Sequence, residues 1–159
     1  MTETAVADVV VEIEIDAPRE EVFDALTDPA AVMDWWTDEG DGYGCTAFES
    51  DVRVGGRWWS EHRPGRGDGP VCVLAGMYTI VERPDRLAFT WVYEKYMESF
   101  EGLPTTTVTI DLSETAGVTH MRLTHSGLAG GSKLGEDHRS GWRHALEGIA
   151  RLFRERSGG

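Results

Sequence analysis

Apolar and polar residues alternate along most of the chain, with the period of two that is typical of strands with one buried face. The pattern is clearest in Asp8–Asp16 (DVVVEIEID), where valines and isoleucines alternate with Glu12, Glu14 and Asp16. Similar stretches predict further strands at Cys45–Val54, Arg57–His62, Val71–Glu82, Leu87–Tyr96, Thr105–Leu112 and Val118–Ser126. Short turns, such as the one at Gly55-Gly56, separate several of these strands and favour an antiparallel meander.

A helical period replaces the alternation in three places. Asp137–Arg156 carries apolar residues at intervals of three and four, which predicts a long helix with one broad apolar stripe. Arg19–Thr27 and Ala30–Trp36 predict two short helices directly after the first strand. Because the sheet has one apolar face that needs a cover, we expect the long helix to lie against it. The stripe then either seals a solid core or roofs a cavity.

Length and charge narrow the classes of function. The 159 residues suit one domain, with a core over about residues 8–156. The net charge of −13 disfavours nucleic acid and anionic membranes as partners, because both need a cationic surface. Cys45 and Cys72 form no CxxC pair, so neither a disulfide framework nor a zinc motif is predicted. With no signal peptide and no apolar run long enough to span a membrane, we expect a cytoplasmic protein.

Several short motifs, spread over roughly residues 9–153, are similar to those of one known family. They are Ile15–Pro18, Leu26–Pro29, Trp35 or Trp36, Val54–Trp58, Gly76, Glu82–Leu87, Phe89–Trp91, Thr119–His125, and Gly141-Trp142 with Leu146. Their order and spacing resemble the START-like, or SRPBCC, superfamily, and more narrowly its chaperone-ATPase-activator homologue (AHSA-type) branch. The resemblance is specific for fold but not for activity, because this superfamily supports many functions with one cavity.

The resemblance implies an α+β helix-grip fold. A curved antiparallel sheet of about six or seven strands would wrap around the long C-terminal helix, with a pocket between them. By alternation, the side chains facing the pocket include Ser60, Ile80, Val108, Ile110 and Leu123, in addition to the candidate ligand-binding residues named next. The candidate ligand-binding residues are Trp35 near a mouth, with Trp58, His62, Tyr78, Phe89, Trp91, Met121, His125, Trp142, Leu146 and Ile149.

Polar residues that could carry chemistry are few. His62 and His125 fall on the predicted inner face, where each could act as a base, anchor a ligand or be a hydrogen-bonded core residue. Tyr78 and Tyr93 could donate to a ligand or could be core or rim residues. The histidine spacings do not predict a metal site, and no nucleophile elbow, phosphate loop or dinucleotide motif is present. We therefore assign no catalytic residue, metal or cofactor.

Three functions follow as hypotheses. The first is a binding protein for a small hydrophobic molecule, a lipid or polyketide, which would reach the pocket past the loops at Thr37–Gly44, Arg63–Pro70 and Met97–Pro104. The second is an enzyme of polyketide cyclase or aromatase type, with His62, His125 or Tyr78 moving protons. The third is a regulator of a chaperone ATPase, as the resemblance suggests. A homodimer is possible through outer-face residues such as Trp59.

Overall fold

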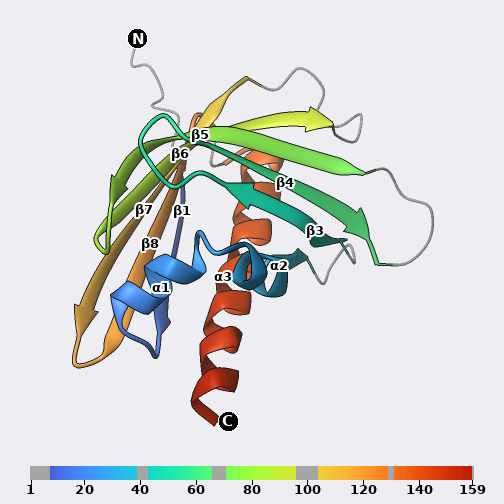
Figure 1. Ribbon diagram of the computed structural model, residues 1–159. Coiled ribbons are helices and arrows are strands. Elements are labelled where there is room, and N and C mark those ends of the chain that lie inside the picture. The colour runs from blue at the N-terminus through green and yellow to red at the C-terminus, as the bar shows by residue number, and fades with distance from the viewer. Residues whose placement is uncertain (1–7, 39–42, 66–70, 96–103, 129–130, 159) are drawn as a thin grey trace.

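The computed structural model describes residues 8–38, 43–65, 71–95, 104–128 and 131–158 (Figure 1). In chain order, the elements are β1 (Val9–Ile15), α1 (Arg19–Ala25), α2 (Pro29–Trp35), β2 (Thr37–Asp38), β3 (Tyr43–Ser50), β4 (Arg57–Pro64), β5 (Cys72–Glu82), β6 (Arg86–Lys95), β7 (Thr106–Thr115), β8 (Val118–Ser126) and α3 (Lys133–Gly158). Much of each loop proposed as a route to the pocket, at residues 39–42, 66–70 and 97–103, lies outside the described residues.

The strands form one antiparallel sheet in the order β1-β8-β7-β6-β5-β4-β3-β2. The strands from β2 to β8 follow one another as the predicted meander, and β1 pairs with β8 at the far edge. The sheet curls around α3, while α2 packs against that helix and α1 lies on the side of β7 and β8 (Figure 1). The predicted fold is thus confirmed. The two-residue strand β2 lies in the predicted loop at Thr37–Gly44, because a strand this short shows no alternation in the sequence.

Short-range hydrogen bonds set where two of the helices begin. The Asp28 side chain accepts from the backbone N–H of Ala31 at 3.0 Å, and Pro29 occupies the first helical position of α2. Ser132 Oγ accepts from the backbone N–H of Gly135 at 3.1 Å, so α3 begins at Lys133 rather than at the predicted Asp137. Within the described residues, no helix is long and apolar enough to cross a membrane.

Strand register aligns the apolar residues into rows on the inner face of the sheet. One row runs through Val11, Leu123, Ile110 and Leu87, each directly opposite the next. A second row runs through Val9, His125, Val108, Phe89 and Tyr78. Because directly opposite residues point to the same face, these rows form a continuous apolar surface against α3.

The expectation that Ile80 faces inward is wrong. The pairing of β5 with β6 shifts register between Tyr78 and Ile80. After this irregularity Val81 lies opposite Leu87 and packs against the core, while Ile80 pairs with Ala88. An inserted residue exchanges the two faces of a strand, and alternation alone does not reveal where that happens.

Candidate functional site

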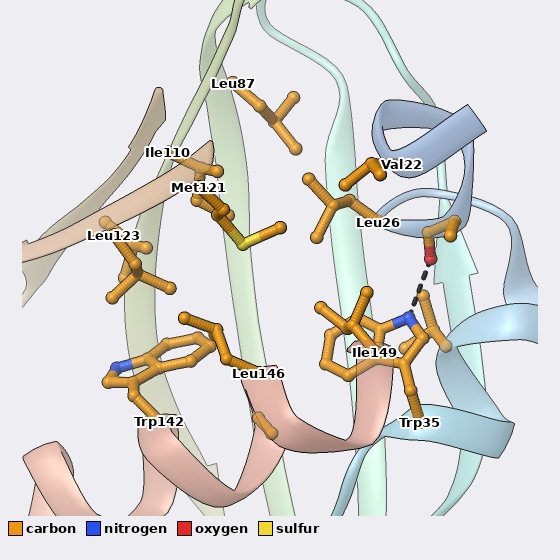
Figure 2. Packing of buried hydrophobic residues seen from close by; sticks show 14 of the residues in the cluster. Val22, Leu26, Trp35, Leu87, Ile110, Met121, Leu123, Trp142, Leu146 and Ile149 are labelled. Carbon is orange, nitrogen blue, oxygen red and sulfur yellow. Dashed lines mark hydrogen bonds between the residues drawn. The ribbon is translucent and has the colours of Figure 1, made fainter. Parts of the chain in front are cut away.

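A small cavity lies between the inner face of the sheet and α3, with α1 and α2 at its side. Its lining side chains come from every layer of the fold and are apolar or aromatic. They are Leu26, Val32, Trp35, Trp36, Phe48, Trp58, Tyr78, Leu87, Phe89, Ile110, Leu123, Trp142, Leu146 and Ile149. Figure 2 shows how Trp142, Leu146 and Ile149 of α3 lie against residues of the sheet and of α1.

The cavity is small in this conformation. Its volume is about 30 Å³, which is enough for about two waters at roughly 10–15 Å³ each. Sites for drug-sized ligands are larger, at roughly 300–1,000 Å³. A larger ligand therefore needs side chains to move before it fits.

Three of the tryptophans that line the cavity are anchored by hydrogen bonds. The indole N–H groups of Trp35, Trp58 and Trp142 donate to Ala25 O at 2.7 Å, to Thr90 O at 3.1 Å and to His125 Nδ1 at 3.0 Å, respectively. The first of these bonds is drawn in Figure 2. Each bond would leave a buried carbonyl or ring nitrogen without its partner if the ring moved, so these rings are fixed parts of the wall.

The position of Trp58 depends on the glycine beside it. A Cβ built on Gly76 would lie 2.4 Å from Trp58 Nε1 and 1.8 Å from Thr90 O. Any side chain at this position would therefore occupy the path of the Trp58–Thr90 bond. The glycine that resembled a family motif thus has a physical role in this chain, which is to let the indole reach the backbone of β6.

Trp36 lies at the centre of the aromatic cluster and was not among the predicted site residues. Its ring centroid is 5.7 Å from that of Trp35, 6.2 Å from Trp142, 5.8 Å from Trp91 and 4.5 Å from His62. Trp35, which we expected near a mouth, is 4% exposed. Trp36 instead is half-buried, so the more accessible of the paired tryptophans is the second one.

His125 is held by hydrogen bonds at both ring nitrogens. Nδ1 accepts from Trp142, so the neutral ring carries its proton on Nε2 and donates to Thr106 Oγ1 at 2.7 Å. Burial, and then the neighbouring His138, lower the pKa of His125 to about 3. His125 is therefore neutral near pH 7, and neither nitrogen is open to a ligand in this conformation.

A second hydrogen-bonded pair joins the buried His138 to the half-buried Tyr93. His138 Nδ1–H donates to Leu134 O at 2.8 Å, so Nε2 accepts from the Tyr93 hydroxyl at 2.7 Å. Burial lowers the pKa of His138 and raises that of Tyr93. The spacing of the histidines in the sequence assigned no role to His138. The signal that could have identified it as buried is its interval of four from Trp142, which places both on one helical face.

His62 lies at the side of the cluster, under the Trp36 ring. Its Nε2 is hydrogen-bonded to Ser60 Oγ at 3.0 Å, and both side chains are buried. Burial lowers the pKa of His62 to about 4, although the nearby Glu61 opposes the shift. Cys45 and Cys72 flank His62 on the adjacent strands, and burial raises the pKa of each thiol to about 11.

The predicted site residues divide into two groups in space. Those that line the cavity are Trp35, Trp58, Tyr78, Phe89, Trp142, Leu146 and Ile149. The others, Trp91, Met121, His62 and His125, are buried beside the cavity without lining it. Burial also raises the pKa of Tyr78 to about 12, so its phenol is neutral. The predicted face was therefore correct for both groups, but alternation does not say which inward residues meet the empty space.

Among the residues that the structure describes, no charged side chain lines the cavity, and the histidines beside it are neutral at pH 7. Across the described ranges, no group of three or more histidine, cysteine, aspartate or glutamate side chains could hold a metal ion. The indole N–H of Trp91 is buried and has no hydrogen-bond acceptor of good geometry among the described residues. The interior thus suits an uncharged apolar molecule better than an ion.

Comparisons with known proteins agree with this fold. The family described as "Activator of Hsp90 ATPase homolog 1-like protein" matches residues 16–154. None of the curated proteins matches the chain.

Solved structures also match over most of the chain. Protein CV1439 from Chromobacterium violaceum is 23% identical, with a TM-score of 0.77 over 92% of this chain and 96% of its own. The AHSA1 protein SPO3351 from Silicibacter pomeroyi is 25% identical, with a TM-score of 0.75 over 94% and 99%. CalU16 from Micromonospora echinospora is 25% identical, with a TM-score of 0.65 over 92% and 75%.

Proposed function

The chain belongs to the Activator of Hsp90 ATPase homolog 1-like family, and from this premise we propose that it binds a small uncharged hydrophobic molecule between the sheet and α3. The observation that carries the proposal is the cavity lined by aromatic and aliphatic side chains from α1, α2, α3 and the sheet. Burying apolar ligand surface there would supply the binding free energy, at about 25 cal/mol per Å².

An enzyme of polyketide cyclase or aromatase type is the second candidate, and the pair formed by Ser60 and His62 supports it. A histidine next to a hydroxyl can take up its proton. Against this candidate, His62 does not line the cavity, and both nitrogens of His125 are already engaged. These observations on the two histidines therefore favour ligand binding over a reaction that transfers protons.

Regulation of a chaperone ATPase is supported by the family description alone. The described surface supplies no further argument for this partner. A pull-down with purified Hsp90 tests this function directly. Recovery of the chaperone would favour regulation of its ATPase over the binding of a small molecule.

Fluorescence titration tests ligand binding. We expect uncharged hydrophobic probes, both fatty alcohols and naphthalene derivatives, to change the tryptophan emission of the protein. Leu146→Phe fills part of the cavity and should weaken binding, whereas Leu152→Phe enlarges a buried leucine of the same helix that does not line it. Absence of any binding, or equal weakening by both variants, would contradict the proposal.

A further inference from the structure

We propose that the Trp36 side chain is a built-in occupant of the aromatic cluster, and that a flat, uncharged aromatic molecule binds by taking its place. This inference rests on the proposed function and adds to it a ligand class and the side chain that moves. It starts from the small size of the cavity, about 30 Å³, which requires a side chain to leave before a ring can enter.

Trp36 is the lining tryptophan with the weakest attachment. The indoles of Trp35, Trp58 and Trp142 each donate a hydrogen bond. Within the described parts of the chain, the Trp36 indole has no hydrogen bond and is held by ring contacts. It is also half-buried, whereas the three anchored rings are buried. Moving Trp36 therefore breaks no buried hydrogen bond and has a short path to solvent.

The backbone of Trp36 does not have to move with the ring. Its N–H donates to Val32 O at 2.9 Å, and its carbonyl accepts from the Cys45 N–H at 3.0 Å. These bonds attach the residue to the end of α2 and to β3. Rotation about the side-chain torsions is thus sufficient to swing the ring out while α2 and the sheet stay in place.

The rings around Trp36 define the shape of a molecule that could replace it. Trp35 and Trp142 lie nearly parallel to Trp36, at interplanar angles of 16° and 20°. His62 meets it edge-on at 72°. The space that Trp36 occupies is therefore bordered by two rings nearly parallel to it, and a planar ring in its place would regain the stacking that Trp36 gives up. An ionic group would lose its hydration without gaining a charged partner from the cavity lining.

Matched probes test the ligand class. 1-Naphthol and decahydro-1-naphthol have the same carbon skeleton and hydroxyl, but only the first is planar, and 1-naphthalenesulfonate adds a charge. We expect calorimetric titration of the wild-type protein to give at least about tenfold tighter binding of 1-naphthol than of either other probe. Equal affinity for the decahydro compound would overturn the planar class, and equal affinity for the sulfonate would overturn the uncharged one.

Fluorine NMR of protein labelled with 5-fluorotryptophan tests the movement of Trp36. The protein has six tryptophans, and the Trp36 signal is assigned from its loss in Trp36→Phe. On saturation with 1-naphthol, we expect this signal to gain the H₂O/D₂O isotope shift of an exposed ring, while the Trp35 and Trp58 signals stay protected. If 1-naphthol binds and the Trp36 ring stays protected, the inference fails although the proposed function stands.

Substitution tests the competition between Trp36 and the ligand. Trp36→Ala removes the internal competitor, so we expect 1-naphthol to bind about tenfold more tightly than to wild type. The affinity of Trp36→Phe for 1-naphthol should lie between those of wild type and Trp36→Ala. Because this variant keeps a ring, it also serves as the test if the alanine variant does not fold. Trp59→Ala is the control, since Trp59 is not part of the lining. Unchanged affinity in both Trp36 variants would overturn the inference. If no probe binds to wild type or to either variant, the proposed function itself fails.

Discussion

The indole N–H of Trp142 donates to Nδ1 of His125 at 3.0 Å, and this bond joins α3 to β8 inside the core. His125 is 0% exposed, so no water replaces Trp142 if the bond is lost. The same bond fixes the tautomer of the ring and makes Nε2 the donor to Thr106. A helix, an inner strand and its neighbour are thus coupled through one imidazole.

Thr106→Val tests the hydrogen bonds that link Trp142, His125 and Thr106. Among these residues, threonine can be replaced with the smallest change in side-chain shape. The substitution removes the acceptor of the His125 Nε2–H and leaves that donor buried without a partner. We expect a loss of about 1–3 kcal/mol in the free energy of unfolding, measured by urea denaturation. Thr109→Val, on the outer face of the same strand, is the matched control and should change stability by no more than about 0.5 kcal/mol. Equal effects of the two substitutions would show that the network contributes nothing.

Acid should destabilise the protein through His62. The unfolded histidine takes up its proton near pH 6.5, whereas burial lowers the pKa of the folded one to about 4. Between these values the unfolded state binds more protons, so stability is fully present above pH 6.5 and is lost as the pH falls towards 4. At about 1.4 kcal/mol per pH unit, His62 accounts for a loss of up to about 3 kcal/mol.

Unfolding free energies of wild type and His62→Gln, measured between pH 8 and pH 4.5, check this prediction. The variant should be less stable at pH 8, because it loses the native contacts of His62. Its free energy of unfolding should nevertheless fall less steeply as the pH is lowered. The difference in slope should correspond to about one proton fewer taken up on unfolding. The carboxylates that do not interact with His62 contribute equally to both curves, so parallel curves would contradict the assignment.

The thiols should be nearly inert in the folded protein. Burial raises the pKa of Cys45 and of Cys72 to about 11, well above the ordinary value of a thiol. Since the thiolate is the reactive form, we expect alkylation by iodoacetamide at pH 8 to be about a hundredfold slower than for free cysteine. Concentrated urea should remove the difference. Rapid alkylation of native protein would show that β3 and β5 open more readily than their burial implies.

The sequence predicts the arrangement of strands and helices in this protein, because an element with one buried face has a regular pattern of apolar residues. A period of two correctly separates the buried His125 from the exposed His120 on β8. A period near 3.6 correctly places Trp142, Leu146 and Ile149 on one face of α3. These features depend on the residue types of a single element, so they can be read without knowing its neighbours.

The features that the sequence did not predict depend on contacts between elements. The register shift that turns Ile80 outward is set by how β5 pairs with β6. The central place of Trp36 depends on five rings from α2, α3 and the sheet. Likewise, the pairing of His138 with Tyr93 joins residues 45 positions apart in the chain. No local pattern encodes such long-range contacts.

Gly148 offers a test of how closely α2 packs against α3. A Cβ built on Gly148 would lie 2.2 Å from Trp35 O, at the point where the two helices meet. The obstructing atom is backbone, so Gly148→Ala has to push α2 away and with it the anchored Trp35. We expect a loss of about 1–3 kcal/mol from this overpacking, measured by urea denaturation, together with weaker binding of hydrophobic probes.

Gly141→Ala is the matched control on the same helix. A Cβ there meets nothing within 4 Å, so alanine should stabilise α3 by about 0.5–1 kcal/mol through its higher helix propensity. The two identical substitutions thus have opposite predicted signs, and the difference arises from the contact with Trp35 alone. If Gly148→Ala also stabilised the protein, α2 would have to be free to shift. The wall of the cavity formed by Trp35 would then be adjustable, and the assignment of movement to Trp36 alone would need to be revised.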